Sequence, residues 1–374
     1  MKGVILVENS FVHPYMPNSV PENKKAMLDE LGINSVEDIY KSIIPDELLY
    51  KERLDIPEPI RSEYELKRHV MGILDRDITT EEYTSFLGAG CYKHQVPAIC
   101  DEVNSRGEFL TAYCGDTYSD HGKMQAIFEY TSMMGELLDT DVVSYTTYDG
   151  GQAVASSLRM AVRAVREKGM PGKVILVPKT MNPEIYSQVV QYCRNVAEVR
   201  KIAYEPETGL MDLEELKEQL AKKNVAAVFF ENPTYLGNFE TRGEEIAKLA
   251  HDAGAYCVVQ TEVAALGIME SPVNQGADIV CGDIQPLGMH IQFGGGQAGF
   301  IACNQNMDLV EQFPTYMYGI TETEKEDTYG WGRAMNYRSS HGSRENAKEY
   351  FGTETGLWAI TAGVYLASMG PQGM

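Results

Sequence analysis

Residues 225–261 read VAAVFFENPTYLGNFETRGEEIAKLAHDAGAYCVVQT, and this stretch decides the fold. It opens with an apolar, β-rich run over 225–230 and closes with a second such run over 256–259. Between them, Thr241-Arg242-Gly243-Glu244 matches a capping box, in which a Thr and a Glu three residues later close the first turn of a helix. Gly254 marks the predicted end of that helix. A buried strand, a capped helix and another buried strand are typical of a parallel βαβ unit.

The same alternation continues on both sides of this stretch. Asp212-Leu213-Glu214-Glu215 predicts a further capped helix, and another helix is expected to begin after Gly150-Gly151. Further β-rich runs lie at 174–177, 277–281 and 299–303. One more helix is predicted from a single apolar face made of Met124, Ile127, Phe128, Met134, Leu137 and Leu138. The sequence therefore predicts an α/β chain whose mostly parallel sheet is covered by helices on both faces.

Three segments are expected along the chain. Residues 1–65 are predicted to form an N-terminal arm, with short helices over 22–31 and 36–42 between closely spaced prolines. Residues 66–330 would form the large domain. Residues 331–374 would form the start of a C-terminal small domain, with a helix over 358–369, which we expect to be cut short at Met374.

Composition limits the partners of this chain. The net charge of −22 argues against binding to nucleic acid or anionic membranes, because phosphate groups need a basic surface. No apolar run approaches the roughly 20 residues that cross a bilayer, and the first residues lack the cleavage site of a signal peptide. The seven cysteines are widely spaced, without a C-x-x-C pair, which predicts reduced cysteines, no metal site and a cytoplasmic location.

Two glycine-containing loops are candidates for a binding site, because ligands of open α/β sheets bind at the carboxyl ends of the strands. The loop Tyr148-Asp149-Gly150-Gly151-Gln152 would place backbone N–H groups at a helix N-terminus, which suits an anion, although such a loop can equally be an ordinary turn. The loop over 282–290 is followed by Gly294-Gly295-Gly296. A pyridoxal-phosphate enzyme carries its Schiff-base lysine on such a loop, yet no lysine or arginine occurs from Leu249 to Glu324.

The chain resembles subunit 1 of the two-subunit glycine dehydrogenase (decarboxylating), the P-protein of the glycine cleavage system. Matching motifs follow one another along nearly the whole sequence. They are Tyr15-Met16-Pro17-Asn18, Ser62-Glu63-Tyr64-Glu65-Leu66-Lys67-Arg68-His69, Ser85-Phe86-Leu87-Gly88-Ala89-Gly90-Cys91-Tyr92, Thr111-Ala112-Tyr113, Gln125-Ala126-Ile127-Phe128-Glu129, Tyr148-Asp149-Gly150, Glu231-Asn232-Pro233-Thr234-Tyr235-Leu236-Gly237, Gln285-Pro286-Leu287-Gly288 and Phe293-Gly294-Gly295.

This resemblance implies the fold of pyridoxal-phosphate-dependent transferases, of the aminotransferase type I kind. It also implies the activity of an aminomethyl-transferring glycine dehydrogenase, an oxidoreductase that acts on CH–NH2 with a disulfide acceptor. The family places the lysine and the covalently held pyridoxal phosphate on subunit 2, and Gln285 stands at the lysine position of this chain. Val258 stands near the place of the aspartate that pairs with the pyridinium nitrogen, with Glu262 a few residues on. The implied partners are subunit 2, in an αβ or α2β2 assembly, the lipoylated H-protein and a small amino acid substrate.

Several residues of the matching segments are candidates for the site. Pocket candidates are three histidines that could carry protons and three tyrosines that could line a channel, although each could equally be a surface or packing residue. No residue of this chain is assigned a catalytic role. The pocket candidates are Tyr92, His94, Tyr113, His121, Tyr148 and His290, and the cofactor-binding candidates are Asp149, Gly150, Gly151, Gln285, Gly294 and Gly295.

One loop departs from the family. Residues 113–122 read YCGDTYSDHG where the family has a Tyr-Thr-Pro-Tyr-Gln-Pro-Glu type of loop close to the active site, so the resemblance leaves the substrate of this chain open. Two alternative functions follow for a diverged paralogue. The chain could be a non-catalytic scaffold or binding subunit, or a lysine-free enzyme that holds pyridoxal phosphate without a covalent bond.

Overall fold

The computed structural model describes residues 12–50, 52, 54–86, 92–110, 121–292, 295–339, 342–349 and 354–374. The chain divides into two compact units, the first ending at Thr79 and the second running from Thr80 to Met374. The first unit therefore includes a helix beyond residue 65, where the predicted arm ends. Residues 331–374 belong to the second unit and are not divided from it. The small domain predicted there stays a prediction.

The first unit consists of short helices, and the predicted helical patches over 22–31 and 36–42 are confirmed. Pro21 occupies the first turn of its helix, where a missing N–H costs nothing, and the Ser62 hydroxyl accepts a hydrogen bond from the Glu65 N–H to cap the last helix. None of the described helices of this unit contains a buried residue. Its elements are η1 (Pro17–Ser19), α1 (Pro21–Leu31), α2 (Glu37–Lys41) and α3 (Glu63–Leu74).

The second unit is built on a seven-stranded sheet with the order β1-β7-β6-β5-β4-β2-β3. Within it β7 is antiparallel to both β6 and β1, and the other paired strands are parallel, so the prediction of a mostly parallel sheet is confirmed. The strands are β1 (Val142–Val143), β2 (Val174–Pro178), β3 (Glu198–Ile202), β4 (Val225–Asn232), β5 (Tyr256–Thr261), β6 (Ile279–Asp283) and β7 (Gly299–Cys303).

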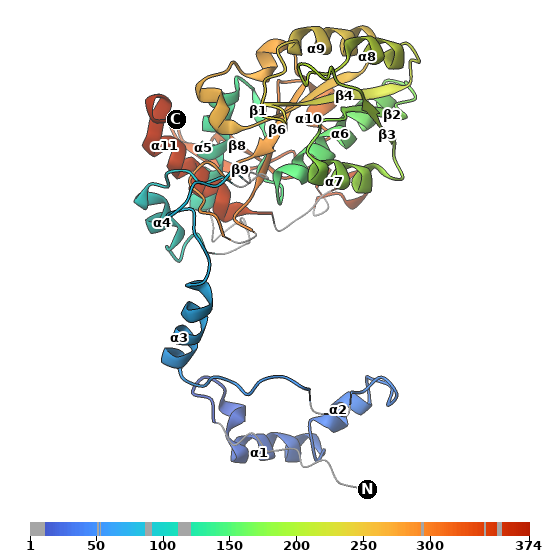
Figure 1. Ribbon diagram of the computed structural model, residues 1–374. Helices are drawn as coiled ribbons and strands as arrows, with labels where there is room; N and C mark the ends of the chain where they lie inside the picture. The colour runs from blue at the N-terminus through green and yellow to red at the C-terminus, as the bar shows by residue number, and fades with distance from the viewer. Residues whose placement is uncertain are drawn as a thin grey trace. The chain divides into compact units, whose positions relative to one another are not determined.

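Helices cover both faces of this sheet (Figure 1), as the sequence predicts. Side chains that alternate along each central strand enter two separate apolar cores, with Val258 of β5 in one and Cys257 and Val259 in the other. Helices α6, α7 and α10 pack on one face, and α5, α8, α9 and α11 pack on the other. The helices are α4 (Ala98–Asn104), α5 (His121–Leu138), α6 (Gly150–Glu167), α7 (Pro183–Cys193), α8 (Leu213–Leu220), α9 (Gly243–Asp252), α10 (Met307–Val310) and α11 (Gly356–Gly373).

Smaller elements complete the second unit. A two-stranded antiparallel hairpin stands apart from the main sheet and contacts α5. Helix α11 contacts α5 and α4, so the predicted helix over 358–369 exists and packs within this unit. The remaining elements are β8 (Met317–Glu322), β9 (Tyr329–Ala334), η2 (Val263–Gly267), η3 (Pro272–Gln275), η4 (Asn336–Arg338) and η5 (Arg344–Asn346).

The helix caps follow the sequence in one case and depart from it in another. The Asp212 carboxylate accepts hydrogen bonds from the N–H groups of Glu214 and Glu215, which confirms the predicted start of α8. The capping box predicted at Thr241 is wrong, because α9 begins at Gly243 with Arg242 as its N-cap and without a capping side chain. The Arg242 N–H and guanidinium bond instead to the Glu240 carboxylate, which fixes the chain before the helix.

The described cysteines fit a further expectation. Cys100, Cys193, Cys257, Cys281 and Cys303 are free and buried, as predicted for reduced core cysteines. Over the described ranges, no helix is long and apolar enough to cross a membrane.

Candidate functional site

The candidate site lies where β6 ends and α6 begins, at Asp283 and Gly150. One oxygen of the Asp283 carboxylate (Oδ2) accepts a hydrogen bond from the Gly150 N–H at 2.8 Å. The other oxygen (Oδ1) accepts from the Gln285 N–H, also at 2.8 Å. The carboxylate therefore joins the sheet, the first turn of α6 and the loop after β6.

Burial dominates the electrostatics of Asp283. Loss of solvent raises the pKa of this carboxyl group to about 7, although the backbone N–H donors that it accepts from act in the opposite direction. The nearby charge of Asp149 raises it further. The group is thus close to half-ionised at neutral pH, which is unusual for a carboxyl group, whose ordinary pKa is about 4.

The N-terminus of α6, where we predict an anion site, already has acceptors for the N–H groups of Gly150 and Gln152. Asp149 caps the helix, with its Oδ1 accepting from the Gln152 N–H at 2.6 Å, and Gly150 donates to Asp283. The adjacent glycines serve close packing. A Cβ atom on Gly150 would lie 3.0 Å from the Asp283 Cβ, and one on Gly151 would lie 2.4 Å from the Gln188 Oε1.

Gln285, at the predicted lysine position, is fully buried. Its Oε1 accepts from the Tyr92 N–H at 3.3 Å, and its Nε2 donates to the Tyr92 carbonyl at 3.4 Å and to the Met289 carbonyl at 2.8 Å. The side-chain amide thus pairs with both main-chain groups of Tyr92. It fastens the segment before α4 to the loop between β6 and β7.

Two candidate histidines extend this contact. The His94 Nδ1 lies 3.1 Å from the Tyr92 carbonyl, and its ring meets the Tyr365 ring of α11 edge-on at 6.4 Å between centroids. The His94 Nε2 is buried and has no hydrogen-bond partner among the described residues. The His290 Nε2 lies 3.1 Å from each oxygen of the Asp101 carboxylate, on an exposed surface.

The structure brings some of the predicted residues together and leaves others apart. Tyr92, His94 and Gln285 form one hydrogen-bonded group, and Gly150 joins it through Asp283, while Asp149 caps the helix beside it. Tyr148 has an exposed side chain, while its N–H donates to the Gln152 Oε1 at 2.8 Å. Gly295 is exposed, with a left-handed backbone (φ 83°). Tyr113, the side chain of His121, Gly294 and most of the departing loop over 113–122 lie outside the described residues.

Asp283 is the site residue that sequence reasoning misses. Its signal is an acidic residue at the last position of an otherwise apolar strand, two residues before Gln285. Glu262 is a second acidic residue at the end of a strand. It follows β5, and burial raises the pKa of its carboxyl group. Over the described ranges, no group of three or more His, Cys, Asp or Glu side chains could hold a metal ion.

These residues do not fit pyridoxal phosphate. A covalent link needs an amine, and Gln285 offers an amide whose hydrogen bonds are already used. A phosphate group would meet the Asp283 and Asp149 carboxylates at the N-terminus of α6, where like charges repel and the N–H groups of Gly150 and Gln152 are occupied. Val258, near the predicted place of a pyridinium-binding aspartate, is an apolar residue buried within β5.

Comparison with known proteins decides the family. The family model described as "Glycine cleavage system P-protein" matches residues 13–374. The chain belongs to the glycine cleavage system P-protein family. The matched residues include nearly all of the first unit and the whole of the second, so both units are part of the P-protein family match.

Several P-protein relatives carry the name "Probable glycine dehydrogenase (decarboxylating) subunit 1". One from Pyrococcus horikoshii is 36% identical over 96% of this chain and 78% of its own length. One from Carboxydothermus hydrogenoformans is also 36% identical, over the same shares. The chain is therefore a P-protein subunit of the subunit 1 type. That name implies a second subunit.

Solved structures agree on the fold. The crystal structure of glycine decarboxylase (P-protein) of the glycine cleavage system, in inhibitor-bound form, matches 97% of this chain and 78% of that chain. The two share 31% identity with a TM-score of 0.79. A sphingosine-1-phosphate lyase of Burkholderia pseudomallei, 14% identical with a TM-score of 0.56, shares the fold alone. The predicted fold of pyridoxal-phosphate-dependent transferases is thus confirmed, and the glycine decarboxylase family depends on that cofactor.

Proposed function

We propose that this chain is the lysine-free subunit of glycine dehydrogenase (decarboxylating) and acts with a lysine-bearing subunit 2. Together they would decarboxylate glycine and pass the aminomethyl group to the lipoyl arm of an H-protein. Pyridoxal phosphate would be held covalently by the partner. The observation that carries this proposal is Gln285, a buried amide bonded to the main chain of Tyr92 and Met289 in place of an amine.

In this proposal the chain shapes a pocket and forms no bond to the substrate. Tyr92, His94 and His290 would present hydrogen-bonding groups on surfaces fixed by Gln285 and Asp101. Tyr148, Tyr113 and His121 are proposed for the same pocket on the family resemblance. A rigid support of this kind holds reacting groups of the partner in place, which is a recognised part of enzyme catalysis.

The first unit supports an obligate partner. The apolar side chains Leu66, Val70, Ile73 and Leu74 of α3 are between 41% and 50% exposed and recur at helical spacing. Helices without a buried residue gain little stability from their own unit. We therefore propose that the first unit lies on subunit 2, and that the complex works in the cytoplasm, as the prokaryotic origin of the relatives supports.

The test is a comparison of the isolated chain with the co-expressed pair. The pair should survive size exclusion and release carbon dioxide from glycine in the presence of lipoylated H-protein. After incubation with pyridoxal phosphate and removal of the unbound aldehyde, the isolated chain should show no absorbance at the Schiff-base band. Borohydride trapping followed by peptide mapping should find no specific lysine adduct. A stoichiometric adduct together with glycine-dependent carbon dioxide release by the chain alone would overturn the proposal.

A non-catalytic scaffold is the second candidate. It is favoured by the Asp283 carboxylate, which fills the N-terminus of α6 with an internal acceptor. The two functions differ in one measurement. If the purified pair shows no glycine decarboxylation and no exchange of carbon dioxide with glycine, while a stable complex forms, the scaffold is the correct assignment.

A further inference from the structure

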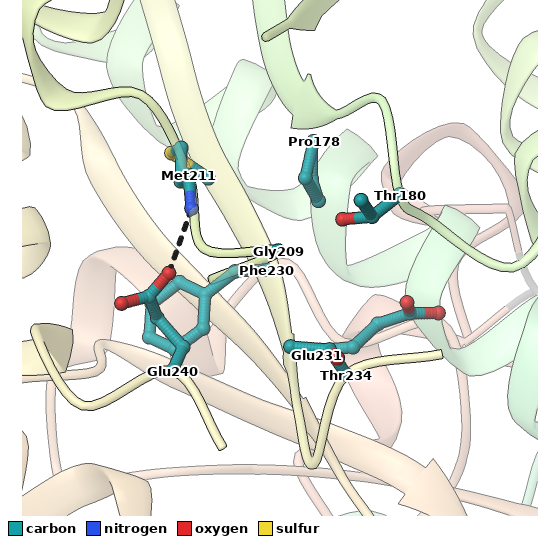
Figure 2. Close-up of a pocket in the computed structure, with 8 residues that line it drawn as sticks. All are labelled: Pro178, Thr180, Gly209, Met211, Phe230, Glu231, Thr234 and Glu240. Atoms are coloured by element: carbon teal, nitrogen blue, oxygen red, sulfur yellow. Dashed lines mark hydrogen bonds between the residues drawn. The ribbon is translucent and has the colours of Figure 1, made fainter. Parts of the chain in front are cut away.

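A small pocket lies at the carboxyl ends of β2 and β4, within the second unit and apart from the residues around Gln285. The residues that matter for its chemistry are Thr180, Met211, Phe230, Glu231, Thr234 and Glu240. In the view of Figure 2, Glu240 and Met211 lie on one side of the pocket, with Thr180 and Glu231 on the other. The cavity measures about 10 Å³, which is room for one water-sized group.

Glu231 is a buried carboxyl group without a cationic partner. Glu231 is only 6% exposed. Its two oxygens each lie 3.2 Å from the Asn182 N–H, and the Tyr235 backbone N–H is a further donor. Backbone donors compensate a carboxylate only in part, and the described residues place no lysine, arginine or histidine in an ion pair with it.

The other carboxylate of the pocket has its charge balanced. Glu240 accepts from the Met211 N–H at 2.9 Å and pairs with the Arg242 guanidinium at 3.3 Å. Arg242 in turn pairs with Glu205 at 2.7 Å. Glu231 is therefore the acceptor in this pocket that an incoming positive charge would meet.

The surroundings of Glu231 suit an organic cation. Pro178, Met211 and Phe230 contribute apolar walls, and the exposed Leu236 side chain lies beside Gly209, which also lines the pocket. A hard metal ion needs about six oxygen ligands, several of them waters where the protein supplies few, and a cavity with room for one water-sized group cannot hold them. A primary ammonium group is water-sized, donates three hydrogen bonds and carries an apolar stem that Leu236 could cover.

We propose that this pocket binds a primary ammonium group, with Glu231 as its anionic acceptor and Thr180 as a neutral one. The group forms a charge-assisted hydrogen bond to the carboxylate, and its alkyl stem leaves the pocket past Gly209 and Leu236. The strongly acidic chain, with its net charge of −22, attracts cations toward this face at low salt.

The first experiment titrates the full-length chain with n-butylammonium chloride in a calorimeter, at an ionic strength held constant with sodium chloride. Saturable binding is expected. Tetramethylammonium chloride has no N–H donor and should give no saturable heat. The absence of saturation with n-butylammonium, or equal binding of tetramethylammonium, would overturn the proposal.

Two variants and a matched control locate the binding. Glu231→Gln keeps the size and one acceptor but removes the charge, and it should weaken n-butylammonium binding at least tenfold. Thr180→Val should weaken it severalfold. The control is Glu207→Gln, an exposed carboxylate on the neighbouring loop, which should bind as the wild type does. Undiminished binding by a folded Glu231→Gln chain would sink the proposal, and if that chain does not fold, the Thr180→Val result decides in the same way.

The pH profile separates this pocket from general surface binding. Burial raises the pKa of Glu231 to about 7, so its ionised fraction rises about tenfold from pH 6 to pH 8, and affinity should rise with it. The other charged groups nearby, Glu240, Arg242 and Glu205, are bonded to one another, and the bond to Arg242 lowers the pKa of Glu205. An affinity that does not change between these pH values would count against Glu231 as the acceptor.

The ammonium group could come from a free amine or from a lysine side chain of a bound protein. Methylammonium and a blocked lysine amide, both titrated in the same way, distinguish these sources. Tighter binding of the lysine amide would identify a protein lysine, whose stem contacts Leu236. Equal affinities would identify a free small amine.

Discussion

The Asp283 carboxylate accepts a hydrogen bond from the Gly150 N–H at 2.8 Å and so ties the end of β6 to the first residue of α6. This contact brings a negative charge to a helix N-terminus, where the helix dipole favours it. The same position is where an outside anion would bind. The chain thus satisfies its own helix end with an internal carboxylate.

The raised pKa of Asp283 predicts how stability changes with pH. The folded value of about 7 lies above the unfolded value of about 4, so the folded state binds the proton more tightly. This contribution to stability is fully present below about pH 4 and is lost as pH rises to 7. When the pH is raised from 5 to 7.5, the urea midpoint of unfolding should therefore fall more for the wild type than for Asp283→Asn.

The control for this measurement is Asp308→Asn, which replaces an exposed aspartate. Its urea midpoint should change with pH as much as that of the wild type. Glu231 and Glu354 also have raised pKa values from burial and contribute slopes of the same sign, so only the difference between variants isolates Asp283. Parallel profiles for the wild type and Asp283→Asn would contradict the assignment.

Replacing Gln285 by alanine should destabilise the second unit. The change leaves the Met289 carbonyl without its Gln285 donor and removes the two contacts of the amide with the main chain of Tyr92. An unsatisfied buried polar group costs about 1–3 kcal/mol. Chemical denaturation measures this cost, and proteolysis near Tyr92 should become faster. Unchanged stability would show that water replaces the amide at no cost.

A charge on the apolar stripe of α3 should weaken the complex with subunit 2. Val70→Asp places a carboxylate among Leu66, Ile73 and Leu74, and should raise the dissociation constant of the pair at least tenfold. Arg68→Asp, on the opposite face of the same helix, is the matched control. Its dissociation constant should be much closer to that of the wild type. Equal effects of the two changes would exclude this stripe as the contact.

Removing Glu349 should release the segment over 342–349 from α6. The Glu349 carboxylate pairs with Arg159 and, at 3.1 Å, with Arg163, whose pKa is lowered to about 10 by burial. Glu349→Ala would leave two partly buried arginines facing each other, at a cost of about 1–3 kcal/mol. Limited proteolysis should cut this segment sooner. Lys248→Ala breaks an exposed pair on α9 and should change little, since such pairs contribute about 0–1 kcal/mol.

The parts of the fold that could be predicted are those with continuous apolar runs. β2, β4 and β5 lie inside the sheet, so each contains a run of at least four apolar residues, which stands out in the sequence. β3 is not predicted, because its sequence EVRKI carries charges that an edge strand exposes. The β8–β9 hairpin is also missed, because Gly319, Gly330 and Gly332 weaken any strand signal.

The candidate site shows the same division. The loop with Gln285 is predictable, because a strand, a polar loop and a glycine cluster follow one another in sequence. The partners of its residues are not, because Gly150 and Asp283 are 133 residues apart and Tyr92 and Gln285 are 193 apart. Such contacts depend on how the whole sheet closes. The capping box at Thr241 failed for a similar reason, since Glu240 holds Arg242 from outside the helix.

Helix α6 is enclosed almost all round, with every residue from Gly150 to Leu158 buried. Its backbone amides therefore have no local route to solvent and should exchange with deuterium only when the second unit unfolds as a whole. The helix would be the slowest-exchanging part of the chain, and Gly150 marks the end of that protected region. Whatever contacts the candidate site must therefore approach through side chains and loops, because the backbone beneath it opens last.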